Sequence, residues 1–286
     1  MTFLWHGVAP PLTRYVNFLY AAQGAMPYSR DGIFPTPAAD LKFNFGEPWR
    51  VSKRLESPGA ASCNQSWCLG LWNQRHFVEW PENTDFIGVS FKPGGAHAFL
   101  GVPLSELRNR VVPLEALWGD AAEIRDRLYD AATPERRFAL LEDLLLARLA
   151  DNSGAARLVE HVAGQIVGRH GTIKISDLCD EVGITHKHLI TLFDRMVGCT
   201  PKQLARLCRF GHTLRNIDLS NRIRWTSVAH DSDYFDQAHF TRDFQAFAGL
   251  SPSAYLRKRL AVFAESPDHA TIPWVLPAGQ ICTSSD

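Results

Sequence analysis

The spacing of apolar residues along the chain changes part-way. In roughly the first hundred residues, apolar residues come in short runs such as Leu41–Phe45 and Phe86–Phe91, in which side chains alternate between two faces. That alternation is typical of β-strands. Turn-forming sequences separate the runs at Gly46–Pro48, Ser57–Gly59 and Lys92–Gly95. This part of the chain is therefore predicted to be rich in β-structure.

From Leu114 onward the apolar residues recur at helical spacing. The first such positions are Ile124, Leu128, Phe138, Leu141, Leu145 and Leu149. Thr133-Pro134 interrupts them and is a helix start signal, because Thr caps a helix and Pro fits its first turn. We therefore expect a helical hairpin, followed by a domain boundary in the polar, turn-prone stretch Asp151–Gly154.

An internal repeat marks the helical region beyond this boundary. A first helix carries Leu158, Val162 and Ile166 on one face and should end at Gly171. After it, four anchor residues recur at a constant offset of 51 positions: Leu189, Phe193, Gly198 and Pro201 match Phe240, Phe244, Gly249 and Pro252, with Thr200 matched by Ser251. In each copy Gly ends one helix and Thr-Pro or Ser-Pro starts the next, so the repeat makes structural sense.

The first copy has the spacing of a helix-turn-helix unit. A short helix at Ser176–Val182 precedes Gly183, which permits a left-handed turn, and Thr185 is placed to cap a helix at His186–Val197. The exposed face of that second helix is expected to contact DNA.

The second copy repeats this arrangement. A helix at Trp225–His230 precedes a turn at Asp231–Tyr234, and Asp236 is placed to cap a helix at Gln237–Phe247. The side chains opposite Phe240 and Phe244 could reach base edges in a major groove. Over the two units the candidate DNA-binding residues are Thr185, His186, Lys187, Ile190, Thr191, Arg195, Asp236, Gln237, Ala238, Thr241 and Arg242.

Charge distribution agrees with this assignment. The 286 residues carry 30 basic and 30 acidic side chains, so the net charge is zero. Residues 155–260, however, contain 15 Lys and Arg against 10 Asp and Glu. The C-terminal region is therefore the basic one, as DNA binding requires.

The segment from about Leu158 to Leu260 resembles the DNA-binding domain of the AraC/XylS family of transcription regulators. The resemblance rests on Tyr234–Phe244 and on Ala248–Tyr255. It implies two recognition helices in adjacent major grooves, separated by a linker helix at about Lys202–Asp218. It also suggests RNA polymerase, a small-molecule effector and a second copy of the chain as partners besides double-stranded DNA.

Two positions depart from the family pattern. Asp233 stands in the turn before the second recognition helix, where the family usually has Gly, and Asp tolerates a positive φ less well than Gly. Thr191 stands where the family often has Arg. The first unit is therefore expected to make fewer charged contacts with DNA.

The N-terminal part resembles a domain of unknown function that is found upstream of such DNA-binding units. The residues that carry this resemblance are Pro11–Tyr15, Phe91–Ala96, Gly101–Pro103 and Val111–Gly119. By analogy this domain would sense a small molecule or mediate self-association. Trp49, Trp67, Trp72 and Trp80 could enclose an apolar ligand, but a role in the structural core is the favoured interpretation.

Taken together, these patterns predict an α+β protein that is cytoplasmic, does not bind a membrane and is not an enzyme. A β-rich sensor or oligomerisation domain with a helical hairpin spans residues 1–152, an all-α DNA-binding domain with two helix-turn-helix units spans 153–262, and a tail spans 263–286. No catalytic, cofactor or metal site is expected, since the sequence contains no phosphate-binding Gly-rich loop, nucleophile elbow or His-Glu zinc motif.

Two alternatives remain open. Some DNA-repair methyl-acceptor proteins carry an AraC-type module and use a reactive Cys, and Cys63 and Cys68 are the only closely spaced cysteines here. They lack the four-Cys metal cluster that activates such a thiol. The other alternative is an interaction protein whose basic module binds another protein rather than DNA.

Overall fold

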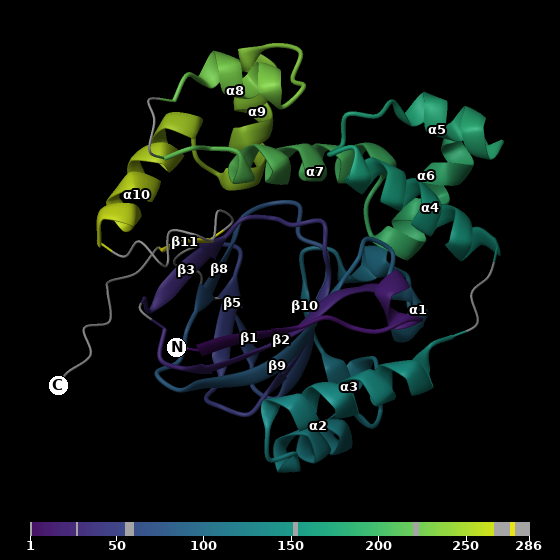
Figure 1. The fold of residues 1–286 in the computed structure, drawn as a ribbon, viewed down its shortest axis with the longest axis vertical. Helices are drawn as coiled ribbons and strands as arrows, with labels where there is room; N and C mark the ends of the chain where they lie inside the picture. Colours follow the sequence, from purple (N-terminus) through teal and green to yellow (C-terminus); the bar gives the residue numbers. More distant parts are fainter. Residues whose placement is uncertain are drawn as a thin grey trace.

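The chain folds into a β-rich N-terminal half and a helical C-terminal half (Figure 1). The computed structural model describes residues 2–26, 28–54, 60–150, 154–219, 223–265 and 275–277. The α+β architecture expected from the sequence is confirmed. The expected turn at Ser57–Gly59 lies outside the described residues. The same holds for residues 151–153 of the expected domain boundary at Asp151–Gly154.

The strands form two antiparallel sheets. The six-stranded sheet has the order β1-β2-β9-β4-β7-β10, and the five-stranded sheet has the order β11-β3-β8-β5-β6. The strand bounds are β1 Thr2–His6, β2 Val16–Gly24, β3 Arg30–Ile33, β4 Asp40–Asn44, β5 Trp49–Ser52, β6 Ala61–Cys63, β7 Ser66–Leu69, β8 His76–Glu79, β9 Thr84–Phe91, β10 Val111–Pro113 and β11 Val275–Pro277.

The strands β4 and β7 of the six-stranded sheet are covered on both faces. Leu41 and Phe43 of β4 belong to a cluster with the helices of the N-terminal half, whereas Trp67 and Leu69 of β7 pack with residues of the five-stranded sheet. Trp49, Trp67 and Trp72 are all buried in that second cluster, as favoured from the sequence. The region between the sheets is therefore a core that contains several tryptophan side chains.

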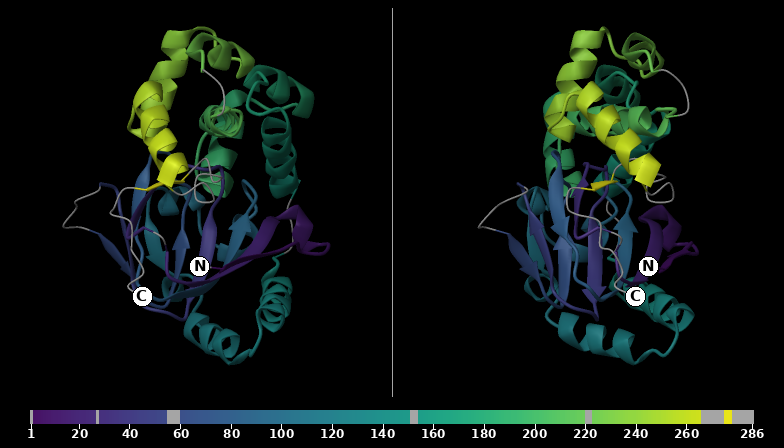
Figure 2. Two further views of the ribbon diagram at one scale, coloured as in Figure 1. Left: turned by 60° about the vertical axis from the view of Figure 1, so that its left-hand side comes forward. Right: turned by 90° about the vertical axis from the view of Figure 1, so that its left-hand side faces the viewer.

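Short helices cover the outer face of the six-stranded sheet and one end of it (Figures 1 and 2). They are η1 Leu12–Arg14, α1 His97–Leu100, η2 Leu104–Leu107, η3 Leu114–Ala116, α2 Ala121–Asp130 and α3 Pro134–Arg148. Helices α2 and α3 form the expected hairpin. Thr133 caps α3, because its side chain accepts a hydrogen bond from the Arg136 N–H, and Pro134 occupies the first turn.

The C-terminal half consists of helices packed around α7. Their bounds are α4 Gly154–Gly168, α5 Ile175–Val182, α6 His186–Val197, α7 Pro201–Arg215, α8 Trp225–Asp231, α9 Gln237–Ala248 and α10 Pro252–Glu265. The linker helix is shorter than the expected Lys202–Asp218. At its C-terminal end the N–H of Asn216 is shared between His212 O and Thr213 O, as is common in the last turn of a helix. Among the described residues, no helix combines the length and the apolar character needed to cross a membrane.

The C-terminal segment returns to the N-terminal half. No strand was expected beyond residue 262, yet β11 pairs with β3 at the edge of the five-stranded sheet. Arg259 of α10 donates a hydrogen bond to Val275 O, at 2.9 Å. The segment expected to be a tail therefore contains the end of α10 and a paired strand.

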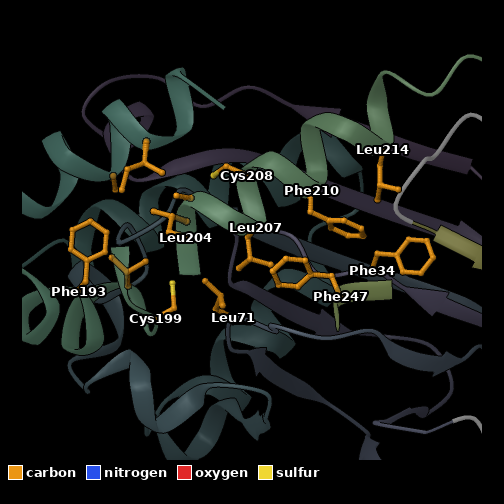
Figure 3. Close-up of a cluster of buried hydrophobic side chains, with 14 of the residues drawn as sticks. Phe34, Leu71, Phe193, Cys199, Leu204, Leu207, Cys208, Phe210, Leu214 and Phe247 are labelled. Carbon is orange, nitrogen blue, oxygen red and sulfur yellow. The ribbon is translucent and has the colours of Figure 1, made fainter. Parts of the chain in front are cut away.

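One apolar cluster joins the two halves of the chain. Phe34 and Leu71 come from the β-rich half but are buried together with the cores of both helix-turn-helix units. Figure 3 shows the two side chains lying along α7. The Phe34 ring centroid lies 6.2 Å from that of Phe210 on α7 and 5.5 Å from that of Tyr255 on α10. The helical half is therefore packed onto the sheets rather than tethered to them by a free linker.

We predict that Phe34→Ala destabilises the whole chain, because Phe34 is fully buried where the two halves meet. Truncating such a side chain costs about 3–5 kcal/mol. Urea unfolding followed by circular dichroism measures the loss. Phe3→Ala is the matched control, since that ring is 37% exposed. Equal stability of the two variants would contradict the shared core.

Candidate DNA-binding surface

Both expected recognition helices begin with a side-chain cap. The Thr185 Oγ1 accepts a hydrogen bond from the His188 N–H at 3.2 Å, and Asp236 Oδ1 accepts one from the His239 N–H at 2.6 Å. These bonds fix where α6 and α9 begin, because each satisfies an N–H that the first turn would leave unpaired. Both caps were predicted from the sequence and are confirmed.

Both helices also end in the predicted way. Gly198 and Gly249 follow α6 and α9 with φ values of 85° and 64°. A side chain at Gly198 would also collide with Leu104, since a Cβ there would lie 2.9 Å from the Leu104 carbonyl oxygen. The next helices are capped by Thr200, which forms a capping box with Gln203, and by Ser251, whose Oγ accepts from the Ala254 N–H. The repeat seen in the sequence is thus a repeat of structure.

Each recognition helix buries one face and exposes the other. Leu189, Phe193, Phe240 and Phe244 are at most 1% exposed. Of the candidate DNA-binding residues, Thr241 is half-buried and the others are exposed: Thr185, His186, Lys187, Ile190, Thr191, Arg195, Asp236, Gln237, Ala238 and Arg242. The exposed set is concentrated in the N-terminal turns of both helices, the part of a recognition helix that reads base edges. Contact of these residues with DNA stays a prediction.

Arg195 is the exception to this concentration. It lies in the last turn of α6, away from the N-terminal turns that carry the other candidates on that helix. Of the candidate residues on α6, Arg195 is therefore the one placed farthest along the helix from its N-terminus.

Helix α7 sets the separation of the two units. Its 15 residues span about 22 Å, and α6 and α9 lie toward its opposite ends (Figure 1). Adding half a helix width at each end gives a separation of roughly 30 Å, similar to the ~34 Å between major-groove segments one turn apart.

A buried ion pair fixes the second unit on α7. Asp243 of α9 is 4% exposed and accepts hydrogen bonds from Arg206 of α7, the shortest at 2.7 Å. The Arg206 Nε lies 3.2 Å from each carboxylate oxygen of Asp243. The hydrogen bond to Asp243 raises the pKa of Arg206. Since removing one partner of such a pair leaves a buried charge uncompensated, the pair constrains the angle of α9 on α7.

The first unit is fixed to the N-terminal half instead. Arg108, which follows η2, donates to Asp194 of α6 at 2.5 Å and also to the Gly198 carbonyl oxygen. The N–H of Arg75 donates to Phe247 O at 2.9 Å, which connects the second unit to the same half. Both recognition helices therefore belong to units that contact the sheet-bearing half directly.

Phe235 was not among the residues selected from the sequence. Its side chain is 94% exposed, in the turn between the buried Tyr234 and the cap Asp236. The sequence signals that could have found it were its position beside the cap and its place in Tyr234–Phe244, the stretch that carries the family resemblance. A ring placed there could contact a thymine methyl group or a deoxyribose.

Asp233 adopts the left-handed conformation that its turn requires. Its φ is 56°, and the Asp233 N–H donates to His230 O at 3.0 Å. The family pattern had suggested a positive φ at this position. Asp therefore holds a conformation that Gly adopts without steric strain.

Cys63 and Cys68 cannot act as a joint reactive site. Cys63 packs between the two sheets, whereas Cys68 packs on the opposite face of the six-stranded sheet, against the helices. Burial raises the pKa of Cys63 to about 12 and also raises the pKa of Cys68. Both remain protonated thiols, which is the opposite of what a methyl acceptor needs.

Two domain families match the chain. Residues 178–258 match a helix-turn-helix domain of AraC type, and residues 8–113 match a domain of unknown function (DUF6597). The raffinose operon transcriptional regulatory protein RafR of Pediococcus pentosaceus is 30% identical over 88 residues. That match covers 31% of this chain and 31% of the relative, so the chain spans about a third of the length of the curated relative it matches.

Solved structures of ToxT from Vibrio cholerae resemble this chain more distantly. An apo variant from strain SCE256 has a TM-score of 0.45 and 11% identity, over 84% of this chain and 96% of that one. The unsaturated fatty acid-bound wild-type protein has a TM-score of 0.42 and 12% identity, over 89% and 94%.

We predict that Asp233→Gly leaves stability unchanged or raises it slightly, because Gly relieves the strain at a φ of 56°. Asp231→Gly is the matched control. Asp231 is an exposed residue in the last turn of α8, where Gly should cost about 0.5–1 kcal/mol. Thermal unfolding of both variants tests this. A larger loss in Asp233→Gly than in Asp231→Gly would show that the Asp233 side chain has a structural role.

Proposed function

We propose that this chain, which carries an AraC-type helix-turn-helix domain at residues 178–258 behind a domain of unknown function at residues 8–113, is a transcription regulator of AraC/XylS type. It would bind double-stranded DNA sequence-specifically through α6 and α9. The supporting observation is that two capped helices with exposed N-terminal turns stand at the two ends of a single rigid helix.

This arrangement favours one mode of DNA recognition, in which a single chain contacts two segments of the major groove. Because α7 fixes the distance between α6 and α9, a single chain would contact two major-groove segments about 10 base pairs apart on one face of the duplex. Such a chain reads an asymmetric site and does not need a palindrome. If straight DNA cannot contact both units, a modest bend would cost a few kcal/mol.

The contacts between the halves support control of DNA binding by the N-terminal half. Arg108 contacts the first unit and Arg75 the second. A signal that shifts the sheets relative to α7 would therefore change both recognition helices together. We propose that residues before 151 sense that signal, and that RNA polymerase and a second copy of the chain are further partners.

Substitutions on α9 test the DNA-binding surface. We expect Arg242→Ala and Gln237→Ala each to weaken specific binding by about 1–3 kcal/mol, as loss of a base-edge contact does, without changing the fold. Phe235→Ala should reduce selectivity at one position. Gln245→Ala is the control for Gln237, since it lies on the same helix about 12 Å farther along the axis and is also exposed. Fluorescence anisotropy with a selected site and a scrambled duplex measures affinity and preference.

These outcomes separate DNA recognition from other roles of the surface. Unchanged affinity and unchanged sequence preference in Arg242→Ala and Gln237→Ala would refute the assignment. If the wild-type chain retains DNA without salt dependence or sequence preference, the basic module serves another purpose, such as binding a protein.

The spacing of the two units predicts a specific footprint. Hydroxyl-radical footprinting and a base-by-base substitution scan with the full chain should show two protected major-groove segments about 10 base pairs apart on one face. The segment read by α9, with Gln237 and Arg242, should be at least as selective as the one read by α6. The oligomeric state is measured in parallel. Protection of only one segment per chain would contradict joint reading.

A further inference from the structure

Strand β1 forms an open edge at one end of the six-stranded sheet. It pairs with β2 without interruption from Thr2 to His6, and no strand pairs with its outer side in the described part of the chain. Backbone N–H and C=O groups on that outer side are therefore available to another extended segment. An edge of this kind is a template for strand pairing with a second molecule.

The other three edges of the two described sheets are protected. Strands β6, β10 and β11 have only three residues each, and both β10 and β11 end in a proline, Pro113 and Pro277. Short edge strands and edge prolines are two ways in which proteins prevent edge-to-edge pairing. Strand β1, by contrast, has five residues, Thr-Phe-Leu-Trp-His, without proline, lysine or an acidic residue among them. Of these four edges, β1 is therefore the one that is left open to pairing.

The side chains of β1 add an exposed aromatic surface to this edge. Trp5 is 60% exposed, although its ring stacks on that of Tyr20 at a centroid distance of 5.8 Å and lies edge-on against Phe18 at 4.9 Å. Phe3 lies 6.1 Å from Trp5 on the same face and is also exposed. A row of exposed aromatic rings along an open edge is typical of a surface that another protein molecule covers.

Contacts on the opposite face hold β1 in place. The His6 ring stacks on Phe138 of α3 at a centroid distance of 5.0 Å, and its Nε2 lies 3.2 Å from Glu142 Oε1. Together with the pairing to β2, these contacts fix β1 as an ordered strand in the single chain. A partner strand that pairs with it therefore does not have to order β1 first, which lowers the entropic cost of association.

The sequence of β1 is complementary to itself. Two β1 strands that pair antiparallel about a two-fold axis at Leu4 bring Phe3 of each chain opposite the partner's Trp5. Both rings of each pair lie on the same face, because directly opposite residues of paired strands share a face. The aromatic pair would occur twice, once on each side of the axis. Aromatic pairs in such positions stabilise antiparallel sheets.

Charge does not oppose this association. The chain has 30 basic and 30 acidic side chains, so two copies do not repel one another through their net charge. Within β1 only His6 can become charged, and in the antiparallel arrangement it lies opposite the partner's Thr2 rather than the partner's His6. Since each copy carries both the open edge and the matching aromatic positions, a second copy of the chain is the partner that this surface fits.

We propose that two copies of this chain associate through β1, by antiparallel pairing about Leu4 that joins their six-stranded sheets. The proposal deepens the proposed function, which includes a second copy of the chain as a partner, by assigning the surface through which that copy binds. Strand β1 belongs to the β-rich half, whereas α6 and α9 belong to the helical half (Figure 1). The pairing therefore leaves the candidate DNA-binding surface of each copy exposed.

Sedimentation velocity of the full chain without DNA tests the interface, with any purification tag placed at the C-terminus. We expect wild-type dimers, and association at least about 10-fold weaker for Phe3→Glu/Trp5→Glu, which brings like charges opposite each other. Phe3→Lys/Trp5→Lys should be impaired in the same way. An equimolar mixture of the two double variants should associate again, because opposite charges then face each other. Tyr129→Lys is the matched control, since Tyr129 is an exposed aromatic residue on α2.

A cysteine crosslink tests the register without relying on charge. Leu4→Cys brings two thiols directly across the two-fold axis, within the Cα separation that a disulfide spans. Trp5→Cys leaves its two thiols offset by two positions along the strands, beyond that separation. Under mild oxidation we expect a crosslinked dimer of Leu4→Cys on a non-reducing gel, and none of Trp5→Cys or of the wild-type chain.

Three outcomes would overturn the interface. They are a wild-type chain that stays monomeric up to about 100 µM, dimers that persist in both folded double variants, and dimers that only Tyr129→Lys abolishes. If circular dichroism shows that the double variants do not fold, the crosslink decides, and its absence in Leu4→Cys refutes the pairing. DNA binding is measured separately. A wild-type chain that dimerises through β1 but binds no DNA would refute the proposed function and leave the interface supported.

Discussion

The packing of α7 onto the sheets is the constraint on which the rest of the structure depends. Leu207 and Phe210 of α7 share one buried cluster with Phe34 and Leu71 of the β-rich half and with the cores of both helix-turn-helix units. At about 25 cal/mol per Å² of apolar surface, such a cluster is a major source of stability for a helical half made of short helices. Neither the separation of the recognition helices nor their angle can change without disturbing it.

This dependence changes how control by the N-terminal half should be understood. A tethered sensor would act on DNA binding by exposing or covering a surface. Here each unit has its own contact with the β-rich half, Arg108 with Asp194 and Arg75 with Phe247, in addition to the shared core. Packed interfaces shift between discrete arrangements rather than deforming continuously. A small change between the sheets would therefore be transmitted as a change in the geometry of both units together.

The parts of the fold that were predictable from sequence are those determined by residues close together in the chain. Thr185 and Asp236 cap helices through N–H groups three positions away, and Gly198 ends a helix through its own backbone. Such local chemistry gives the same result wherever the segment is packed. The length of the linker helix was overestimated, because residues 216–218 carry no Gly or Pro that would mark its end at Arg215.

What could not be predicted depends on contacts between distant residues. The pairing of β11 with β3 joins segments more than 200 positions apart, and no pattern in Val275–Pro277 indicates its partner. The position of Lys42 is a similar case. In Leu41–Phe45 it reads as the polar, outward residue of an alternating strand, but a second sheet covers that face, so the polar position lies inside. Alternation in the sequence indicates which residues share a face of a strand. Whether the polar face is exposed to water or covered by a second sheet is determined by the tertiary structure alone.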